Sequence, residues 1–279
     1  MALTAAERQI ERPSARRLRP VLGWPLGLSA LPLLVFLILP LLALLRFTPA
    51  PMVLHYLGDP ATTQAIVLSL TTSTITALLV LALGLPAAYI LARRPPRPAR
   101  LLEVVIDLPT VLPPAVAGLA LLMAFGRRGL LGNVLGRLGI EVAFTTVAVI
   151  MAQLFVSAPY FIKTAAVSLA DVNPELEEAA EMDGAHPLQV FRLIMLPLAW
   201  RGIVGGLALC WARALGEFGA TIIFAGNYPG RTQTMPLAVY IGFEIDLNQA
   251  LTLAVILLAI SFLVLTGVRA VLREQRYRT

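Results

Sequence analysis

Cysteine and histidine are nearly absent from this sequence. Its 279 residues include one cysteine, Cys210, and two histidines, His55 and His186. A lone cysteine excludes an intramolecular disulfide and a cluster of thiolate metal ligands, and the two histidines are too far apart for metal-ligand spacing. No activated nucleophile or paired acid and base stands out either. The sequence therefore predicts no catalytic residue and no metal site.

Charge is also scarce. Charged residues make up 14% of the chain, against about 25% in a soluble domain. Hydrophobic residues make up 58%, aromatic residues only 7%, and the mean hydropathy is +0.81. These values exclude an ordinary water-soluble protein and indicate an integral membrane protein. The net charge of +6 comes from basic residues grouped in a few short segments, so no nucleic-acid partner is expected.

Six apolar runs are long enough to cross a bilayer, which takes about 20 residues. They cover about 26–46, 64–92, 104–125, 142–168, 198–224 and 249–270. The first could be misread as a cleaved signal peptide, but it is longer than a usual signal region and no clear A-x-A-like site follows it. We predict an all-α integral membrane protein with six transmembrane helices, the first of which is retained.

Basic residues predict the orientation, because cytoplasmic loops are rich in Lys and Arg. They gather at the N-terminus, in the connection RRPPRPAR and at the C-terminus, as Arg8, Arg12, Arg16, Arg17, Arg19, Arg93, Arg94, Arg97, Arg100, Arg269, Arg273, Arg276 and Arg278. With six helices all of these fall on one side, so both termini are expected in the cytoplasm. The loop with Arg127, Arg128 and Arg137 is an exception that would lie outside. Its first two arginines could meet an acidic patch on a partner protein or anchor at headgroups.

An acidic segment, EAAEMDGAHPLQVFRLIMLP at 178–197, lies between the fourth and fifth runs. Asn173 and Pro174 suit the start of a helix and Gly184 suits its end. Glu175, Glu177 and Glu178 lie near that start, where the helix dipole favours negative charge. Leu176, Ala179 and Ala180 form a narrow apolar face. A second short helix can begin after His186-Pro187, with Val190, Phe191 and Ile194 as its inner face. From these residues alone, a docking hairpin and an ordinary solvated loop both remain open.

The same segment carries a spaced motif: E-A-A, three residues, Gly, nine residues, Ile, one residue, Leu-Pro. The positions that meet it are Glu178, Ala179, Ala180, Gly184, Ile194, Leu196 and Pro197. This spacing resembles the EAA loop of permease subunits from bacterial ABC importers. The resemblance implies that residues 169–197 form a cytoplasmic coupling hairpin, which docks into a groove on an ATPase subunit.

The resemblance extends along most of the chain. Residues from about 62 to 268 resemble the type I ABC importer permease fold. It implies four parts: a basic cytoplasmic segment (1–25), an extra first transmembrane helix with an outer loop (26–61), the permease domain (62–270) and a basic cytoplasmic tail (271–279).

Two further stretches point to the substrate. The stretches LPTVLPPAVAGLALL at 108–122 and RALGEFGATIIFAGNYPGRTQTMPLAVY at 213–240 resemble the oxyanion branch of these permeases, and the second is most like molybdate and tungstate permeases. Sulfate permeases share parts of it. The resemblance thus implies molybdate or tungstate as the substrate, with a sulfate/thiosulfate permease as the alternative.

The family resemblance also implies partners. These are two cytoplasmic ATPase subunits, which hold ATP and Mg, an extracytoplasmic oxyanion-binding protein, and a second permease copy, which we expect to form a homodimer in the bacterial plasma (inner) membrane. The chain itself has no Gly-Lys-Ser or Gly-Lys-Thr phosphate loop, so no cofactor is expected on it. An ion-coupled secondary transporter is the alternative of another class, but such proteins usually show internal repeats, and no convincing repeat is present.

Several residues stand out inside the apolar runs. Pro109, Pro113 and Pro114 should distort the third run, and Pro159 the fourth. Distorted backbone at membrane depth either lines water or is a structural kink, and both readings stay open. A row of hydroxyls in the second run is expected to bond to its own backbone or to neighbouring helices: Thr71, Thr72, Ser73, Thr74 and Thr76.

Arg213 and Glu217 lie four residues apart, hence on one helix face. Ionisable groups at this depth are costly and face a cavity or each other, so the pair either neutralises itself or places a cation near the path of a dianion. The candidate residues of a translocation path are Arg213, Glu217, Asn227, Arg231, Thr232 and Thr234.

Overall fold

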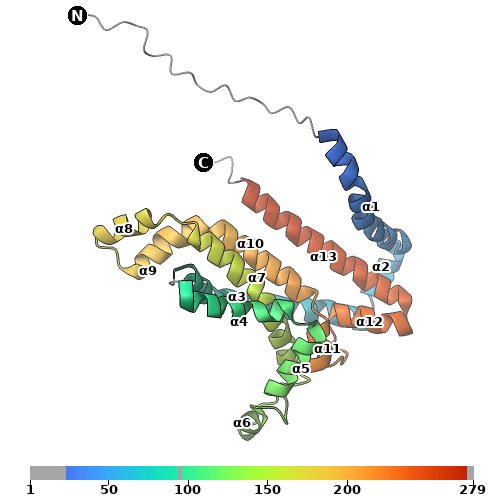
Figure 1. Ribbon diagram of the computed structural model, residues 1–279. Helices are drawn as coiled ribbons and strands as arrows, with labels where there is room; N and C mark the ends of the chain where they lie inside the picture. Colours follow the sequence, from blue (N-terminus) through green and yellow to red (C-terminus); the bar gives the residue numbers. More distant parts are fainter. Residues whose placement is uncertain (1–22, 94–95, 275–279) are drawn as a thin grey trace, which may run out of the picture. The chain divides into compact units, whose positions relative to one another are not determined.

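The computed structural model describes residues 23–93 and 96–274, where every regular element is a helix. In chain order these are α1 (Gly23–Phe47), α2 (Ala50–Leu57), α3 (Pro60–Arg93), α4 (Pro96–Val111), α5 (Pro114–Phe125), α6 (Gly132–Arg137), α7 (Thr146–Ala170), α8 (Pro174–Met182), α9 (Pro187–Val190), the π-helical η1 (Phe191–Met195), α10 (Leu196–Leu215), α11 (Gly219–Phe224), α12 (Met235–Ile245) and α13 (Leu247–Glu274) (Figure 1). Most of the predicted basic N-terminal segment, Arg94, and Arg276 and Arg278 lie outside the described residues.

The chain forms two compact units, and the boundary between them follows Arg46. The first unit contributes α1, whose stretch Leu28–Phe47 is apolar and long enough to cross a membrane. The second unit, from Phe47 onward, contains all the other helices.

The predicted helical membrane architecture is confirmed. Within residues 23–93 and 96–274, five helices are long and apolar enough to span a bilayer: Leu28–Phe47, Pro60–Arg93, Thr146–Ala170, Pro187–Leu215 and Leu247–Ala270. A sixth candidate is the pair Leu101–Val111 and Pro114–Phe125, which qualifies only when its two bent parts are counted together.

The third run is not the single distorted helix that the sequence suggested. Its two parts, α4 and α5, meet at an angle of 113°. The break comes at Pro113 and Pro114, which lack backbone donors and occupy the N-cap and first turn of α5. Pro109 lies inside α4, and α7 continues through Pro159 as one helix. The expected distortion therefore falls at one proline pair.

The fifth run is also different from the prediction of one span over 198–224. Its helix begins earlier, at Pro187, and ends at Leu215. Residues 219–224 form the separate helix α11. Gly216 follows the last residue of α10 and, with Glu217 and Phe218, makes the break.

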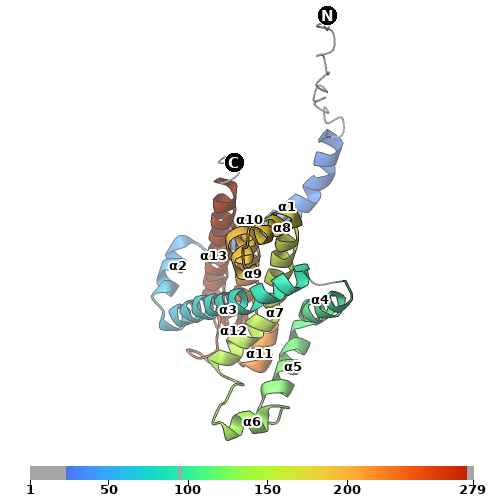
Figure 2. The ribbon, with the colours of Figure 1, turned by 90° about the vertical axis from the view of Figure 1, so that its left-hand side faces the viewer.

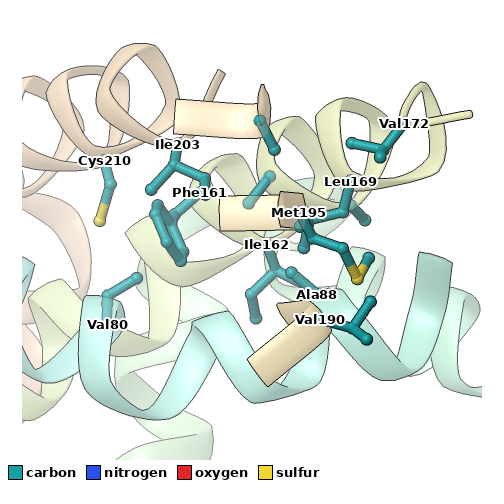
Figure 3. Close-up of a cluster of buried hydrophobic side chains, with 13 residues drawn as sticks. Val80, Ala88, Phe161, Ile162, Leu169, Val172, Val190, Met195, Ile203 and Cys210 are labelled. Atoms are coloured by element: carbon teal, nitrogen blue, oxygen red, sulfur yellow. The ribbon is translucent and has the colours of Figure 1, made fainter. Parts of the chain in front are cut away.

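The main core lies between α3, α7, α10 and the end of α9 (Figure 3). Phe161, Leu169 and Met195 are among its fully buried side chains. Val190 and Ala88 extend the cluster to the hairpin end of the bundle, and Cys210 closes its other end. Because this core ties α9 to α3 and α7, it gives the 169–197 segment a fixed base.

Helix α7 separates two functional ends of the second unit. It has 25 residues, which corresponds to about 37 Å at 1.5 Å per residue. The helices α8 and α9 lie beyond its C-terminal end, and α6 lies toward its N-terminal end (Figure 1, Figure 2). This length exceeds the roughly 30 Å of a bilayer core, so the two ends can face opposite sides of a membrane.

Candidate functional site

The hairpin of residues 169–197 begins with the predicted helix start. The side chain of Asn173 accepts a hydrogen bond from the backbone N–H of Glu175 at 3.1 Å, and Pro174 is the first residue of α8. Glu175 and Glu177 lie in the first turn, where the helix dipole favours negative charge. Each of these local roles agrees with the sequence prediction.

The turn after α8 depends on Gly184, whose φ is +87°. The N–H of Ala185 donates to the carbonyl of Ala180 at 2.9 Å, and the N–H of Gly184 donates to Glu181 at 3.0 Å. This pair of bonds is a Schellman motif, which needs a left-handed residue at the position of the glycine. The predicted helix stop is therefore confirmed, together with its reason.

The return helix has a cap that the sequence analysis missed. The Nδ1 atom of His186 accepts from the N–H of Leu188 at 3.3 Å, and Gln189 Oε1 accepts from the N–H of His186 at 2.8 Å. This is a capping box with histidine in the place of Ser or Thr. Gln189, three residues after His186, was the sequence signal from which this cap could have been predicted.

The return helix starts at Pro187, as predicted, and continues into the fifth span without a break. The π-helical turn η1 joins α9 directly to α10. Ile194 and Leu196 are half-buried at this junction and Pro197 is exposed at the start of α10. The hairpin is therefore connected to α10 through continuous helix. Single π turns are often found at functional sites.

Helix α8 projects from the bundle, and its residues are exposed except for the half-buried Glu177 and Ala180. Glu178 and Ala179 are exposed, and so are the apolar side chains of Met182 (88%) and Leu188 (66%). The exposed surface of α8 and α9 therefore combines carboxylates with apolar side chains, as expected for a docking element.

One long-range ion pair holds α8 against the bundle. It joins Arg93, at the end of α3, to Glu177, and both side chains are largely buried. Sequence reasoning placed both residues in the cytoplasm but gave no reason to pair them, because 84 positions separate them.

The two breaks in the transmembrane helices pack against each other. A Cβ atom added to Gly219, at the start of α11, would lie 2.5 Å from Pro114 Cβ, and one added to Gly118 would lie 2.6 Å from the carbonyl oxygen of Ala220. Only glycine permits such an approach. The start of α5 and the start of α11 are thereby held together.

Arg213 and Glu217 meet at this junction. Arg213 Nη1 lies 2.6 Å from Glu217 Oε2, and the carboxylate is 1% exposed. Glu217 Oε1 also accepts the N–H of Ala220 at 2.8 Å. The buried carboxylate thus caps α11 while it neutralises an arginine in the last turn of α10. The Arg213 side chain keeps 28% exposure.

The other candidate path residues follow α11, but they do not form one cluster of donors. Thr232 and Thr234 are buried, Asn227 is half-buried and Arg231 is exposed. The hydroxyl of Thr232 accepts the N–H of Tyr228 at 2.9 Å. Thr232 therefore stabilises the loop, and Arg231 is the one of these four residues whose charge is open to solvent.

The hydroxyl row on α3 is satisfied internally, as predicted. Thr71, Thr72 and Ser73 donate to carbonyls one turn earlier in α3. Across to α7, Thr76 donates to Gln153 Oε1 at 3.1 Å, and Gln153 Nε2 donates back to Thr72 Oγ1 at 3.2 Å. Thr74 accepts from Trp211 Nε1 at 3.3 Å. These hydroxyls link helices.

At the end opposite the hairpin, carboxylates join three helices. Asp59 Oδ2 accepts the N–H of Thr62 at 2.9 Å and Gln249 Nε2 at 3.0 Å. Asp246 Oδ2 accepts the Tyr56 hydroxyl at 2.7 Å. The backbone bond from Thr62 lowers the pKa of Asp59, and the Tyr56 bond lowers the pKa of Asp246 and raises the pKa of Tyr56.

Comparison with known proteins shows a match for most of the chain. Residues 81–279 match the family described as binding-protein-dependent transport system inner membrane component. The molybdenum transport system permease protein ModB of Mycobacterium tuberculosis is 40% identical over 243 residues, 87% of this chain and 92% of that protein. The sulfate transport system permease protein CysT of Salmonella typhimurium is 34% identical over 259 residues, 91% of this chain and 94% of that protein.

The fold is also similar to that of solved transporters. A chain in the crystal structure of a bacterial ABC transporter involved in the import of the acidic polysaccharide alginate superposes with a TM-score of 0.71. The match covers 90% of this chain and 96% of that chain at 16% identity. At this identity the likeness concerns the fold alone.

Proposed function

Because the chain belongs to the family of binding-protein-dependent transport system inner membrane components, we propose that it is the membrane subunit of an ATP-driven importer of molybdate or tungstate. The assignment of molybdate or tungstate as the substrate rests on the 40% identity over 243 residues to a molybdenum permease. The 34% identity to a sulfate permease makes sulfate the alternative. The chain is a multi-pass inner-membrane permease and does not itself catalyse a reaction.

The energy for import comes, in this proposal, from ATP and Mg on two cytoplasmic ATPase subunits that contact the hairpin. The exposed carboxylates of α8 and the apolar side chains of Met182 and Leu188 support this role. The largely buried Arg93–Glu177 ion pair gives the docked hairpin a second connection to the bundle. Force on α8 would then reach α3 through this pair and α10 through η1.

We propose six membrane crossings with both termini in the cytoplasm. The end of α3 contacts the hairpin through Arg93, whereas α7 begins about 37 Å away, at its opposite end. In this proposal the chain crosses the membrane between them through α4 and α5. We count this bent pair as one span.

A path between two copies of this permease is the proposed route for the anion. The chain holds a single docking hairpin, and two ATPase subunits need two of them, so we propose a homodimer. An extracytoplasmic binding protein would deliver the anion to it. Cross-linking that finds only monomers in a transport-competent complex would contradict this assembly.

Within the path, Arg213 is the residue to test. Arg213→Ala leaves the Glu217 carboxylate buried without its cation, so uptake should fall whichever role the arginine has. The double change Arg213→Ala/Glu217→Gln removes both charges but keeps a side-chain oxygen at 217 that can accept the N–H of Ala220. Restored uptake would assign the pair a structural role, and continued loss would support a place on the anion path.

The function is tested by uptake into vesicles that contain ATP and carry the complete transporter, with molybdate, tungstate and sulfate compared. We expect molybdate and tungstate to be taken up and to compete with each other, with sulfate a weaker competitor. Preferred uptake of sulfate would support the alternative, and uptake of none of the three would refute oxyanion import.

A further inference from the structure

A second ion pair lies within the transmembrane helices, apart from Arg213–Glu217. It joins Lys163 of α7 to Asp107 of α4, with 2.9 Å between Nζ and Oδ2. Lys163 belongs to the apolar span of α7, and Asp107 belongs to the first part of the bent span formed by α4 and α5. Neither residue was among the path candidates predicted from the sequence.

Lys163 lies well inside its span. It comes seven residues before Ala170, the last residue of α7, which is about 10 Å from the hairpin end at 1.5 Å per residue. The Cα–Cβ bonds of a helix tilt toward its N-terminus, and for α7 that direction leads away from the hairpin. The side chain therefore leans toward the middle of the span rather than toward the headgroups on the hairpin side.

The ion pair lies on a face of α7 that this chain leaves uncovered. On the other side of the helix, Phe161 and Ile162 pack into the main core with α3 and α10 (Figure 3). Tyr160, Lys163 and Val167 are exposed, and spacings of three and four residues place them on one face. The two side chains of the ion pair keep 47% and 31% exposure. Charges are costly to place against hydrocarbon, so we expect this face to border water.

The ammonium of Lys163 keeps donors for a ligand. Of its three N–H donors, one meets Asp107, and no other described side chain receives one. The carboxylate also limits how strongly an anion is held, because the anion has to compete with it for the ammonium. A weak site of this kind suits conduction, which needs binding that is favourable enough for entry and weak enough for release.

Arg213 lies further from the hairpin than Lys163. Helix α7 ends at the hairpin and α10 begins there, so the two helices run in opposite directions. A Cβ atom added to Gly206 would lie 3.0 Å from Cβ of Thr164, the neighbour of Lys163. Arg213 comes seven residues after Gly206 along α10, about 10 Å at 1.5 Å per residue. The two cations are therefore separate steps along the bundle, and each has its own carboxylate.

We propose that Lys163 is an inner cation of the anion path, which binds a tetrahedral dianion loosely after it has passed Arg213 and before it enters the cytoplasm. Asp107 is the positioning residue that holds the ammonium at the exposed face and limits retention of the anion. This inference rests on the proposed oxyanion import and leaves delivery to the binding protein on the opposite side. It adds a residue on the cytoplasmic half of the path.

Two introduced cysteines report on this face, since the one native cysteine is buried. Tyr160→Cys and Val167→Cys flank Lys163, and the native side chains there are 39% and 62% exposed. The matched control is Phe262→Cys, at a 65% exposed residue inside the apolar span of α13. The full transporter in lipid nanodiscs, where reagents reach both sides, is treated with an anionic or a cationic methanethiosulfonate.

Both reporter cysteines should react much faster than Phe262→Cys, because the reactive thiolate forms only in contact with water. Lys163→Gln should lower the ratio of anionic to cationic labelling at the reporters roughly fivefold at low salt, the effect of one unit charge at about 8 Å in water on reagents of opposite sign. Sodium molybdate should slow labelling more than sodium chloride of equal ionic strength, and Lys163→Gln should abolish this protection. Lys163→Arg should retain both effects.

A neutral pair separates anion binding from a structural link. Lys163→Gln/Asp107→Asn can keep a hydrogen bond between α4 and α7 without either charge, so a pair that only joins the helices would leave uptake and protection by molybdate normal. We expect this double variant to lose the protection and to take up molybdate severalfold more slowly. Asp107→Asn alone should increase the protection, because the carboxylate no longer competes with the anion.

The outcomes also separate this inference from the proposed function. Labelling at both reporters as slow as at Phe262→Cys, with normal uptake of molybdate, would show a face closed to water and overturn the inference. Unchanged charge preference and protection in Lys163→Gln would overturn it as well. Both results leave oxyanion import standing. Failure of the unmodified transporter to take up any oxyanion would instead refute the proposed function, and the inference with it.

Discussion

The turn at Gly184 gives the sharpest test of the coupling hairpin. Its φ is +87°, and an added Cβ atom would meet no atom within 4 Å. Gly184→Ala therefore causes no clash, and its only direct cost is a left-handed backbone at a non-glycine residue, about 1 kcal/mol. Most residues of α8 are exposed, and its contacts with the bundle come from the half-buried Glu177 and Ala180, so few contacts hold the turn in place against this cost.

The expected effect on function follows from this energy. A cost of about 1 kcal/mol reduces the population of the native turn relative to other turn conformations up to about fivefold. The apparent affinity for the ATPase subunit falls by the same factor, since only the native hairpin docks. Gly184→Val should be worse, because a β-branched residue is strained further at positive φ. Both changes should reduce ATP-driven uptake while the protein still inserts in the membrane.

Two controls isolate the backbone effect. Gly184→Asn should keep most of the activity, because asparagine tolerates the left-handed region. Gly267→Ala adds the same methyl group inside α13, also with no atom within 4 Å, and should leave uptake and ATPase co-purification unchanged. If Gly184→Ala and Gly267→Ala behave alike in both assays, the hairpin does not couple through this turn.

Glu178→Lys, which reverses a charge on the exposed surface of α8, should weaken co-purification of the ATPase subunit without altering the turn.

Three further predictions follow from other contacts. Arg93→Glu and Glu177→Arg should each reduce uptake severalfold, and the combined swap should recover most of it; a swap no better than the single changes would mean that the ion pair is not part of coupling. A membrane-impermeant thiol reagent applied from outside should label a cysteine at Leu130 but not one at Met182, two positions of nearly equal exposure, and the reverse result in sealed cells would invert the topology. Asp246→Asn should lower the melting temperature at neutral pH, because the depressed pKa of Asp246 contributes stability that is fully present above its unfolded value of about 3.9. The difference from the unmodified protein should therefore begin to shrink as pH falls below about 4 and vanish only below the lower folded pKa, and a constant difference would refute the carboxylate's role.

Local signals along the chain were sufficient to predict the hairpin. Asn173, Pro174 and Gly184 act on backbone groups one to four residues away, and each has the predicted role. Such interactions join residues that are close in the sequence, so they can be predicted from the sequence alone. The same holds for the hydroxyls of α3 that bond one turn back.

Contacts between distant residues could not be predicted in this way. Three features depend on residues that only the fold brings together. They are the Arg93–Glu177 ion pair, the hydrogen bonds of Gln153 between α3 and α7, and the positive φ of Phe144. The angle at Pro113–Pro114 was also out of reach, because proline removes a hydrogen bond but does not determine the direction of the next helix. That direction depends on packing, here on the close approach of Pro114 to Gly219.

The junction of the two broken helices shows why the pairing of Arg213 with Glu217 was visible in the sequence while its consequence was not. Spacing of four residues implies a shared helix face, yet α10 ends before Glu217, and the carboxylate turns to cap α11 instead. A helix that ends at membrane depth needs partners for its free backbone groups, and Glu217 provides one for the N–H of Ala220. Its negative charge then has to be balanced, and Arg213 does so while part of its side chain stays exposed. One buried acid therefore allows both the helix break and a half-buried arginine beside it, so a structural role and a place near an anion path are compatible for this pair.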